Sequence, residues 1–342
     1  MDFVAAMEYA NTLSLRALGN TSPNPIVGAV LIDDSGSIIS EGFHQRGRQN
    51  SPGQHAEIIA LELAGEKALG STLVVTLEPC NHHGKTPPCS EALIKAGVAR
   101  VIYAVDDPHQ IARGGAKRLM DAGIEVQSGI GAEVVAWSNR AWLTKIKKNR
   151  PLITIKIATT LDGYIAAEDG SSKWITSSAA REDVALLRSQ CDAIVTGTGT
   201  VLADDPLLTA RIPGISHQPE RIVLGERAIP ADSKILNNDA PTTVINSRKI
   251  EDLLEFSRNR SFNHLLVEAG PTLTTALIKS GIVDEVILYQ APTILGSGRS
   301  AIGSLGISTL QDRCDFVLHD LRAVGAGALA NSRTHLISKG EQ

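Results

Sequence analysis

Three residues in the first third of the chain have the types and spacing of a zinc site. His55 opens a His-Ala-Glu segment, Cys80 follows a proline, and eight residues separate Cys80 from Cys89. One imidazole and two thiolates suit tetrahedral Zn²⁺ and leave its fourth position open for water, whose pKa the metal lowers to about 7. Glu57 lies two residues past His55, so its carboxylate can carry a proton from that water to a leaving amine. The pattern predicts a catalytic metal centre.

The same residues also fit two other interpretations. Zinc could be held in a closed structural site, which needs a fourth protein ligand, and His44, His82 and His83 are candidates for it. Alternatively, the two cysteines are buried and unconnected. The catalytic interpretation is favoured because Cys89 opens a helical pattern and Cys80 follows a strand. His-x-Glu with Pro-Cys and a second cysteine is also the signature of zinc deaminases, here with a wider cysteine spacing.

The second half contains a candidate anion site where a strand meets a helix. In VEAGPTLTTALI (267–278) the strand ends at Glu268, Gly270 allows a close approach of the backbone, and Pro271 suits the first turn of a helix. The free N–H groups of that turn, with the Thr272 hydroxyl, suit a dinucleotide phosphate. Taken alone, the segment could also be an ordinary junction.

A further candidate lies at IVTGTGTVLADDPLLTAR (194–211), where a strand runs into small residues that would admit a cofactor. Asp204 can accept hydrogen bonds from sugar hydroxyls, and Arg211 can bind a phosphate. This segment, too, could be an ordinary junction. The run from Gly296 to Ala301 matches the glycines of a dinucleotide fingerprint, but no helical pattern follows it, so we predict a loop.

Hydrophobic periodicity predicts α/β architecture in both halves. A helix beginning near residue 133 ends in a basic run closed by Pro151, where we place a domain boundary. The predicted domains are therefore 1–147 and 151–342. The predicted elements are an opening helix from residue 2, strands 26–32 and 37–43, helix 55–63, strand 73–77, helix 89–95, strand 101–105, and a helix and strand ending near 126; the second half has strands 152–158, 193–197, 221–225, 242–246, 264–268 and 285–290 and helices 181–190 and 271–281.

Composition narrows the class of protein. The chain has 342 residues, enough for two domains, and its 43% hydrophobic and 20% charged residues are typical of a soluble globular protein. A net charge of -4 and 4% aromatic residues argue against a nucleic-acid surface and favour a small-molecule substrate. No signal peptide or membrane span is apparent, and four cysteines are too few for a disulfide scaffold. We therefore expect a cytoplasmic protein.

Several motifs resemble a known family, the bifunctional riboflavin-biosynthesis deaminases and reductases. The resemblance covers nearly the whole chain. It implies a cytidine-deaminase-like α/β/α domain followed by a dihydrofolate-reductase-like α/β domain, with Zn²⁺ and NADPH as cofactors. The matching motifs are Asn24-Pro25, Gly42-Phe43-His44, His55-Ala56-Glu57, the run from Thr76 to Cys89, Lys156, Leu161-Asp162-Gly163, Ser172 to Ser177, Arg188, Thr200 to Pro206, Leu208, Arg211 and Glu268 to Thr272.

The resemblance also implies roles for individual residues. His55, Cys80 and Cys89 would bind zinc, Glu57 would shuttle a proton during replacement of the C2 amine of a phosphoribosylated diaminopyrimidine, and Lys156 and Glu268 would help open and reduce the ribosyl group. The implied NADPH residues are Thr159, Trp174, Thr200, Asp204, Gly270, Pro271, Thr272, Leu273, Thr274, Thr275 and Ala276, and the implied substrate residues are Asn24, His82, Lys85, Thr86, Ser172, Arg188, Leu208, Arg211 and Glu268.

Three alternatives to a bifunctional enzyme remain open on the sequence. The second half could have lost cofactor binding and leave a monofunctional deaminase. The zinc site could instead stabilise an interaction protein, and a base editor of nucleic acid is disfavoured because no basic groove is apparent.

Two single residues and the oligomeric state also carry expectations. Trp174 could be a core residue. Glu226 replaces a Ser or Thr usual in the family and would repel the 2′-phosphate of NADPH. Two-domain metabolic enzymes often form symmetric homo-oligomers, which we expect here.

Overall fold

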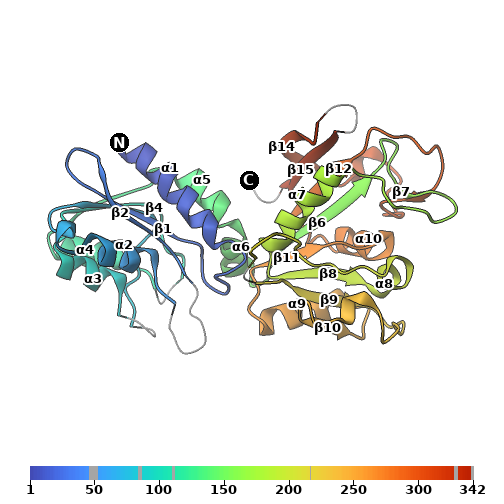
Figure 1. Ribbon diagram of the computed structural model, residues 1–342, viewed down its shortest axis with the longest axis horizontal. Coiled ribbons are helices and arrows are strands. Elements are labelled where there is room, and N and C mark those ends of the chain that lie inside the picture. Colours follow the sequence, from blue (N-terminus) through green and yellow to red (C-terminus); the bar gives the residue numbers. More distant parts are fainter. Residues whose placement is uncertain (46–52, 84–86, 110–111, 216, 327–329, 340–342) are drawn as a thin grey trace. The chain divides into compact units, whose positions relative to one another are not determined.

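The computed structural model describes residues 1–342 except 46–52, 84–86, 110–111, 216, 327–329 and 340–342. The chain divides into two compact units, Met1–Asn149 and Arg150–Gln342, which we call unit 1 and unit 2 (Figure 1). Each unit is an α/β structure with its own sheet and hydrophobic core.

Unit 1 is built on a sheet with the strand order β2-β1-β3-β4-β5. Strand β1 pairs antiparallel with β2 and β3, whereas β3, β4 and β5 are parallel. The elements are α1 (Phe3–Ser14), β1 (Gly28–Ile32), β2 (Ile38–Phe43), α2 (Ala56–Ala64), β3 (Thr72–Leu77), α3 (Cys89–Ala96), β4 (Arg100–Val105), α4 (Gly115–Asp121), β5 (Glu125–Ser128), α5 (Ala132–Ser138) and α6 (Arg140–Lys148).

Helices cover both faces of this sheet because side chains alternate along each strand. On β1, Leu31 joins the core cluster that contains α2, α3 and α4, whereas Val30 joins the cluster that contains α1 and α5. The first turn of α2 packs closely against β2, since a Cβ on Gly42 would lie 2.3 Å from the Ala56 carbonyl oxygen. The result is a three-layer α/β/α unit that holds the start of α2 in a fixed place.

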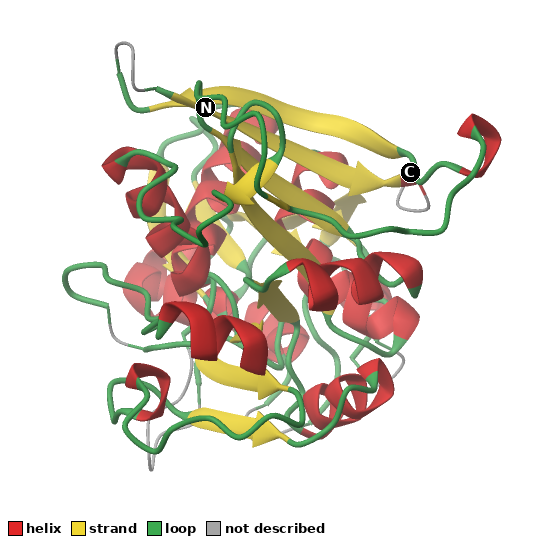
Figure 2. Cartoon of the chain, turned by 90° about the vertical axis from the view of Figure 1, so that its right-hand side faces the viewer, coloured by secondary structure: helices red, strands yellow, loops and turns green. Residues whose placement is uncertain are grey.

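Unit 2 contains a larger, mostly parallel sheet with the strand order β10-β9-β8-β11-β6-β12-β15-β14, in which only the pairs formed by β15 are antiparallel. Helices α9 and α10 pack on one face, and α7 and α8 pack on the other (Figures 1 and 2). The elements are β6 (Leu152–Thr159), β7 (Tyr164–Ala166), α7 (Ser178–Ser189), β8 (Ala193–Gly197), α8 (Thr198–Asp204), β9 (Glu220–Leu224), β10 (Thr242–Ile245), α9 (Ile250–Asn259), β11 (His264–Val267), α10 (Pro271–Lys279), β12 (Glu285–Gln290), β13 (Arg299–Ser300), β14 (Phe316–Val324) and β15 (Asn331–Ser338).

The elements predicted from the sequence are confirmed, with boundaries shifted by a few residues. The helix predicted from residue 133 is wrong in one respect, because it breaks at Asn139 into α5 and α6. The Asn139 amide accepts from the Ile26 N–H at 3.0 Å and donates to the Ile26 carbonyl at 2.9 Å, a contact that no local pattern reveals. No helix follows the glycines of the segment from Gly296 to Ala301, as predicted, and the segment is a loop apart from the two-residue strand β13 within it.

Candidate metal centre and second polar site

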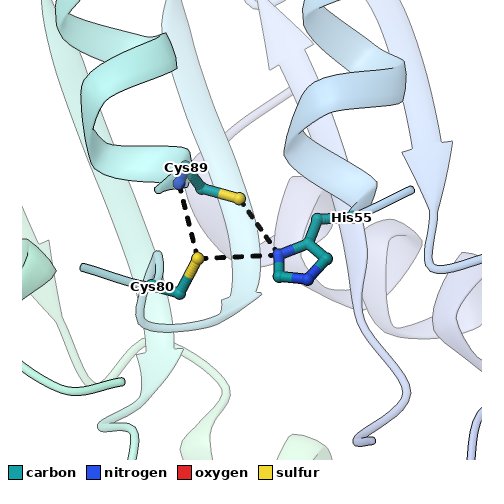
Figure 3. Close-up of side chains that lie close together, drawn as sticks. All are labelled: His55, Cys80 and Cys89. Carbon is teal, nitrogen blue, oxygen red and sulfur yellow. Dashed lines mark hydrogen bonds between the residues drawn. The ribbon is translucent and has the colours of Figure 1, made fainter. Parts of the chain in front are cut away.

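His55, Cys80 and Cys89 come together in unit 1 (Figure 3). His55 is the residue directly before α2, Cys80 lies three residues after β3, and Cys89 is the first residue of α3. Their three ligand atoms lie within 4.8 Å of one another. The His55 Nδ1 atom is 3.2 Å from the Cys89 Sγ atom and 3.6 Å from the Cys80 Sγ atom.

These distances fit zinc. In a tetrahedral site with Zn–S bonds of about 2.3 Å and a Zn–N bond of about 2.0–2.1 Å, nitrogen and sulfur ligands lie about 3.5 Å apart. Within the part of the chain that the structure describes, no further His, Cys, Asp or Glu joins the cluster. His44 stacks on the His55 ring with a centroid distance of 5.3 Å, and His83 lies 3.3 Å from Glu91. The donor set therefore suits a metal site with an open fourth position.

One of the two cysteines carries a negative charge in this cluster. A hydrogen bond from the Cys89 thiol, more than the one from His55, lowers the pKa of Cys80 to about 4, so Cys80 is a thiolate at neutral pH. The backbone N–H of Cys89, at the start of α3, also donates to the Cys80 sulfur at 3.4 Å. This contact is the kind of stabilisation that a helix N-terminus offers to a thiolate.

Glu57 lies in the first turn of α2 and is only 4% exposed. Burial raises the pKa of its carboxyl group, the direction needed by a group that must both accept and donate a proton near neutral pH. The His-x-Glu spacing thus puts the ligand at the N-cap of α2 and the carboxyl group in the first turn of the same helix, beside the cluster.

A residue that the sequence reasoning missed, Glu78, fixes the segment that carries Cys80. Its buried carboxylate accepts hydrogen bonds from three backbone N–H groups, those of Asp107 at 3.2 Å, Gly114 at 3.1 Å and Ala116 at 3.0 Å. The same segment packs so tightly that a Cβ on Gly115 would lie 1.8 Å from the Pro79 carbonyl oxygen. The position of Glu78 directly before Pro-Cys was a weak signal, because the sequence does not show which amides it binds.

The remaining unit 1 residues with an implied substrate role are Asn24, His82, Lys85 and Thr86. The Nδ1 atom of His82 is buried and has no hydrogen-bond partner among the described residues. Asn24 is exposed in the segment before β1, and its N–H donates to the Thr21 carbonyl at 2.9 Å, as in a turn. Lys85 and Thr86 lie outside the described residues.

A second polar site lies in unit 2, where the β6 and β11 strands meet α7. The Glu268 carboxylate binds the Arg188 guanidinium through two hydrogen bonds of 2.5 and 2.9 Å and the Lys156 ammonium at 3.0 Å. These two cations overcome the effect of burial and hold the pKa of Glu268 well below its usual range. The Glu268 side chain is 6% exposed, so the site is a preorganised, desolvated charge cluster.

The junctions predicted for an anion or cofactor lie beside this cluster. Helix α10 begins with Pro271, as predicted, and the N–H of Gly270 donates to the Thr200 hydroxyl at 3.0 Å. That contact brings the first turns after β8 and β11 together. Trp174 is 68% exposed, so its interpretation as a core residue is wrong; the Arg181 guanidinium lies 4.4 Å from its ring centroid.

Other implied unit 2 residues differ in exposure and contacts. Thr159, Thr274 and Thr275 are buried, and the Thr275 hydroxyl accepts from the Gly303 N–H at 2.8 Å. Those that are partly or largely exposed are Ser172, Asp204, Pro271, Thr272, Leu273 and Ala276. Glu226 forms an ion pair with Arg248 at 2.9 Å, so its charge is compensated.

Comparisons with known proteins agree with this arrangement. Residues 3–105 match the family model of the cytidine and deoxycytidylate deaminase zinc-binding region, and residues 151–329 match that of the RibD C-terminal domain. The riboflavin biosynthesis protein RibD of Mycobacterium tuberculosis is 44% identical over 328 residues, which cover 95% of each chain. RibD of Escherichia coli is 40% identical over 93% of this chain and 96% of that protein.

Solved structures agree along the whole chain. Acinetobacter baumannii RibD has a TM-score of 0.87 and 36% identity and covers 98% of this chain and 99% of that one. A Thermotoga maritima protein described as a diaminohydroxyphosphoribosylaminopyrimidine deaminase/5-amino-6-(5-phosphoribosylamino)uracil reductase has a TM-score of 0.89 and 31% identity, and 98% of each chain is covered.

The fold and the two sites define a bifunctional enzyme that combines a zinc-dependent deaminase domain with an NADPH-dependent reductase domain. The cytidine-deaminase-like and dihydrofolate-reductase-like folds implied by the motifs are confirmed. The chain belongs to the RibD family of riboflavin biosynthesis proteins. In the described residues, no helix has the length and apolar character needed to cross a membrane.

Proposed function

We propose that this enzyme acts on two successive phosphoribosyl pyrimidines. Residues 1–147 would replace the C2 amine of 2,5-diamino-6-(5-phosphoribosylamino)pyrimidin-4(3H)-one by oxygen, consuming water and releasing ammonia. Residues 151–342 would reduce the ribosyl group of 5-amino-6-(5-phosphoribosylamino)uracil to a ribityl chain. The description of the Thermotoga maritima relative supports this substrate class. The observation that carries the proposal is the His55, Cys80 and Cys89 cluster beside buried Glu57.

For the deaminase step, His55, Cys80 and Cys89 would hold the metal. Zinc, when bound, lowers the pKa of water and thereby supplies a nucleophile at neutral pH. Glu57 takes a proton from the water and gives it to the departing amine, so protons are conserved. His82 suits substrate recognition because its buried Nδ1 atom lacks a protein partner among the described residues. Asn24, Lys85 and Thr86 complete the proposed substrate contacts.

For the reductase step, Lys156 and Glu268 would open the ribose ring and deliver the proton. When bound, NADPH would supply a hydride for this reduction at C1 of the sugar. Lys156 is the group in the cluster that can donate a proton, and Glu268 holds it through the 3.0 Å ion pair. The proposed substrate residues are Ser172, Arg188, Leu208, Arg211 and Glu268, and the proposed NADPH residues are Thr159, Trp174, Thr200, Asp204 and Gly270 to Ala276.

We also propose a symmetric homo-oligomer in the cytoplasm. Strand β14 is the outermost strand of the unit 2 sheet, and its Leu318 and Leu321 side chains are 56% and 60% exposed. A long edge strand with exposed apolar side chains tends to pair with another chain. A second copy of β14 would cover this edge around a twofold axis.

Mass analysis of the products tests the two activities. Purified protein is incubated with the diaminopyrimidine nucleotide, with and without NADPH. We expect ammonia and the uracil nucleotide without NADPH, and the ribityl product when NADPH is added. Glu57→Gln should retain zinc and keep its reductase activity on the uracil nucleotide. Its deaminase rate should fall about 10²–10⁴-fold. Release of ammonia at an unchanged rate by this variant would exclude Glu57 from the mechanism.

A further inference from the structure

The segment that leads from α8 towards β9 is a loop whose backbone is held by the side chains of Gln218 and Arg221. Residues 206–210 belong to no helix or strand. The Gln218 amide binds both polar backbone groups of Ala210: it accepts from the Ala210 N–H at 2.8 Å and donates to the Ala210 carbonyl at 2.9 Å. At the other end, the Arg221 guanidinium donates to the Leu207 carbonyl at 3.2 Å.

Arg221 is an unusual anchor because its side chain is fully buried and its guanidinium donates hydrogen bonds to neutral oxygens. Its guanidinium also donates to the side-chain and backbone oxygens of Asn237, at 2.9 and 2.6 Å, and to the Ala240 carbonyl at 2.5 Å. Burial lowers the pKa of Arg221 below its ordinary value, which reflects the cost of placing a cation there. The neutral oxygens that accept its hydrogen bonds and the charge of nearby Asp239 offset this cost.

Between the two anchors, Leu208 adopts a left-handed backbone conformation with φ 48°. A side chain with a Cβ pays about 1–2 kcal/mol for this conformation, and such strain persists only where the surroundings impose it. The surroundings here are the two anchors and the packing of Leu208, which is 5% exposed. Strained residues of this kind cluster at functional sites.

The anchored segment is joined directly to the charge cluster. The Arg188 guanidinium, which binds Glu268, also donates to the Thr209 carbonyl at 3.1 Å. Arg211 is exposed and follows the anchored residues without a break. The segment therefore connects a buried anion–cation cluster to an exposed guanidinium that suits a phosphate.

We propose that Gln218 and Arg221 are positioning residues for the reductase substrate. They hold residues 207–210 in the strained conformation that places Arg211 where it meets the phosphate of the phosphoribosyl group. This inference rests on the proposed function, because it takes Arg211 as a substrate residue. Holding the segment in advance removes an ordering cost from substrate binding, so the effect belongs mainly to the KM for the pyrimidine.

Steady-state kinetics of Gln218→Met test the role of the amide. Methionine keeps the size of the side chain and removes both hydrogen bonds to Ala210. We expect the KM for the uracil nucleotide to rise about tenfold, the effect of losing two modest hydrogen bonds. The kcat, the KM for NADPH and the deaminase rate should remain within twofold. Gln311→Met, at an exposed position of the same unit, is the matched control and should change none of these values.

A double-mutant cycle separates positioning from general support of the fold. If Gln218 acts through Arg211, Gln218→Met should have no further effect on KM when Arg211 is already replaced by Ala. If Arg211→Ala alone leaves KM unchanged, the proposed substrate role of Arg211 is wrong. If Arg211→Ala raises KM but Gln218→Met does not, or if their effects on KM multiply, the positioning role is overturned.

Discussion

The carboxylate of Glu78 offers a direct test of how the protein tunes its metal centre. In Glu78→Gln, the remaining oxygen can still accept from Gly114 and Ala116, but the new amide N–H₂ then faces the Asp107 N–H, which was bound at 3.2 Å. A hydrogen bond to a charged group contributes about 1.5–3 kcal/mol, and a buried N–H left without a partner costs about 1–3 kcal/mol. Cys80 lies two residues after Glu78 on the same segment. Part of this free energy is therefore lost from the conformation in which Cys80 can bind the metal.

We expect the dissociation constant for zinc to increase 10- to 100-fold, the usual effect of removing a group that orients a ligand. This range corresponds to about 1.4–2.7 kcal/mol, less than the full local cost, because the segment can relax in part. The His55 ligand is anchored separately at the cap of α2, so zinc should still bind.

Competition with a chromophoric chelator measures the zinc affinity of the full chain independently of turnover. Glu66→Gln is the matched control, since Glu66 is an exposed acid of the same unit. The reductase rate reports whether unit 2 remains folded in each variant. Zinc affinity within twofold of the parent chain for a folded Glu78→Gln protein would refute the idea that these three amide contacts support the ligand segment.

Three further predictions concern other parts of the molecule. Glu268→Gln leaves buried Arg188 and partly buried Lys156 without their shared carboxylate, so unit 2 should lose about 3 kcal/mol of stability in urea unfolding. Because the pKa of Glu268 is depressed, the parent loses this contribution as the pH falls below about 4.3, and the variant should show a shallower acid dependence. Gly42→Ala should weaken zinc binding by chelator competition, because its Cβ would lie 2.3 Å from the first carbonyl of α2. Leu318→Lys should shift the protein towards monomers in light scattering, whereas an unchanged mass would exclude this edge as the interface.

Local patterns were sufficient to predict most of the elements. Apolar runs and helical periodicity identified β6 and α10 within a few residues, because strand and helix formation there follow from neighbouring side chains. Strands β14 and β15 were missed because they carry charged residues, which local patterns do not associate with strands. These charges form ion pairs with residues distant in the sequence, as in the 2.6 Å pair between Arg322 and Asp183. The break at Asn139 was missed because its partner Ile26 lies 113 positions away.

The sequence by itself determined the chemistry of the metal centre and the family of the enzyme. The ligand types, the His-x-Glu spacing and the helix starts are all local, so they can be recognised without a fold. The tertiary structure alone decided which backbone groups Glu78 binds, how Arg188 joins Glu268 to Thr209, and that Gln218 clamps Ala210. The physical reason is that these contacts depend on how the strands are ordered in the sheets and where the loops between them fold back, whereas a sequence pattern records only neighbours along the chain.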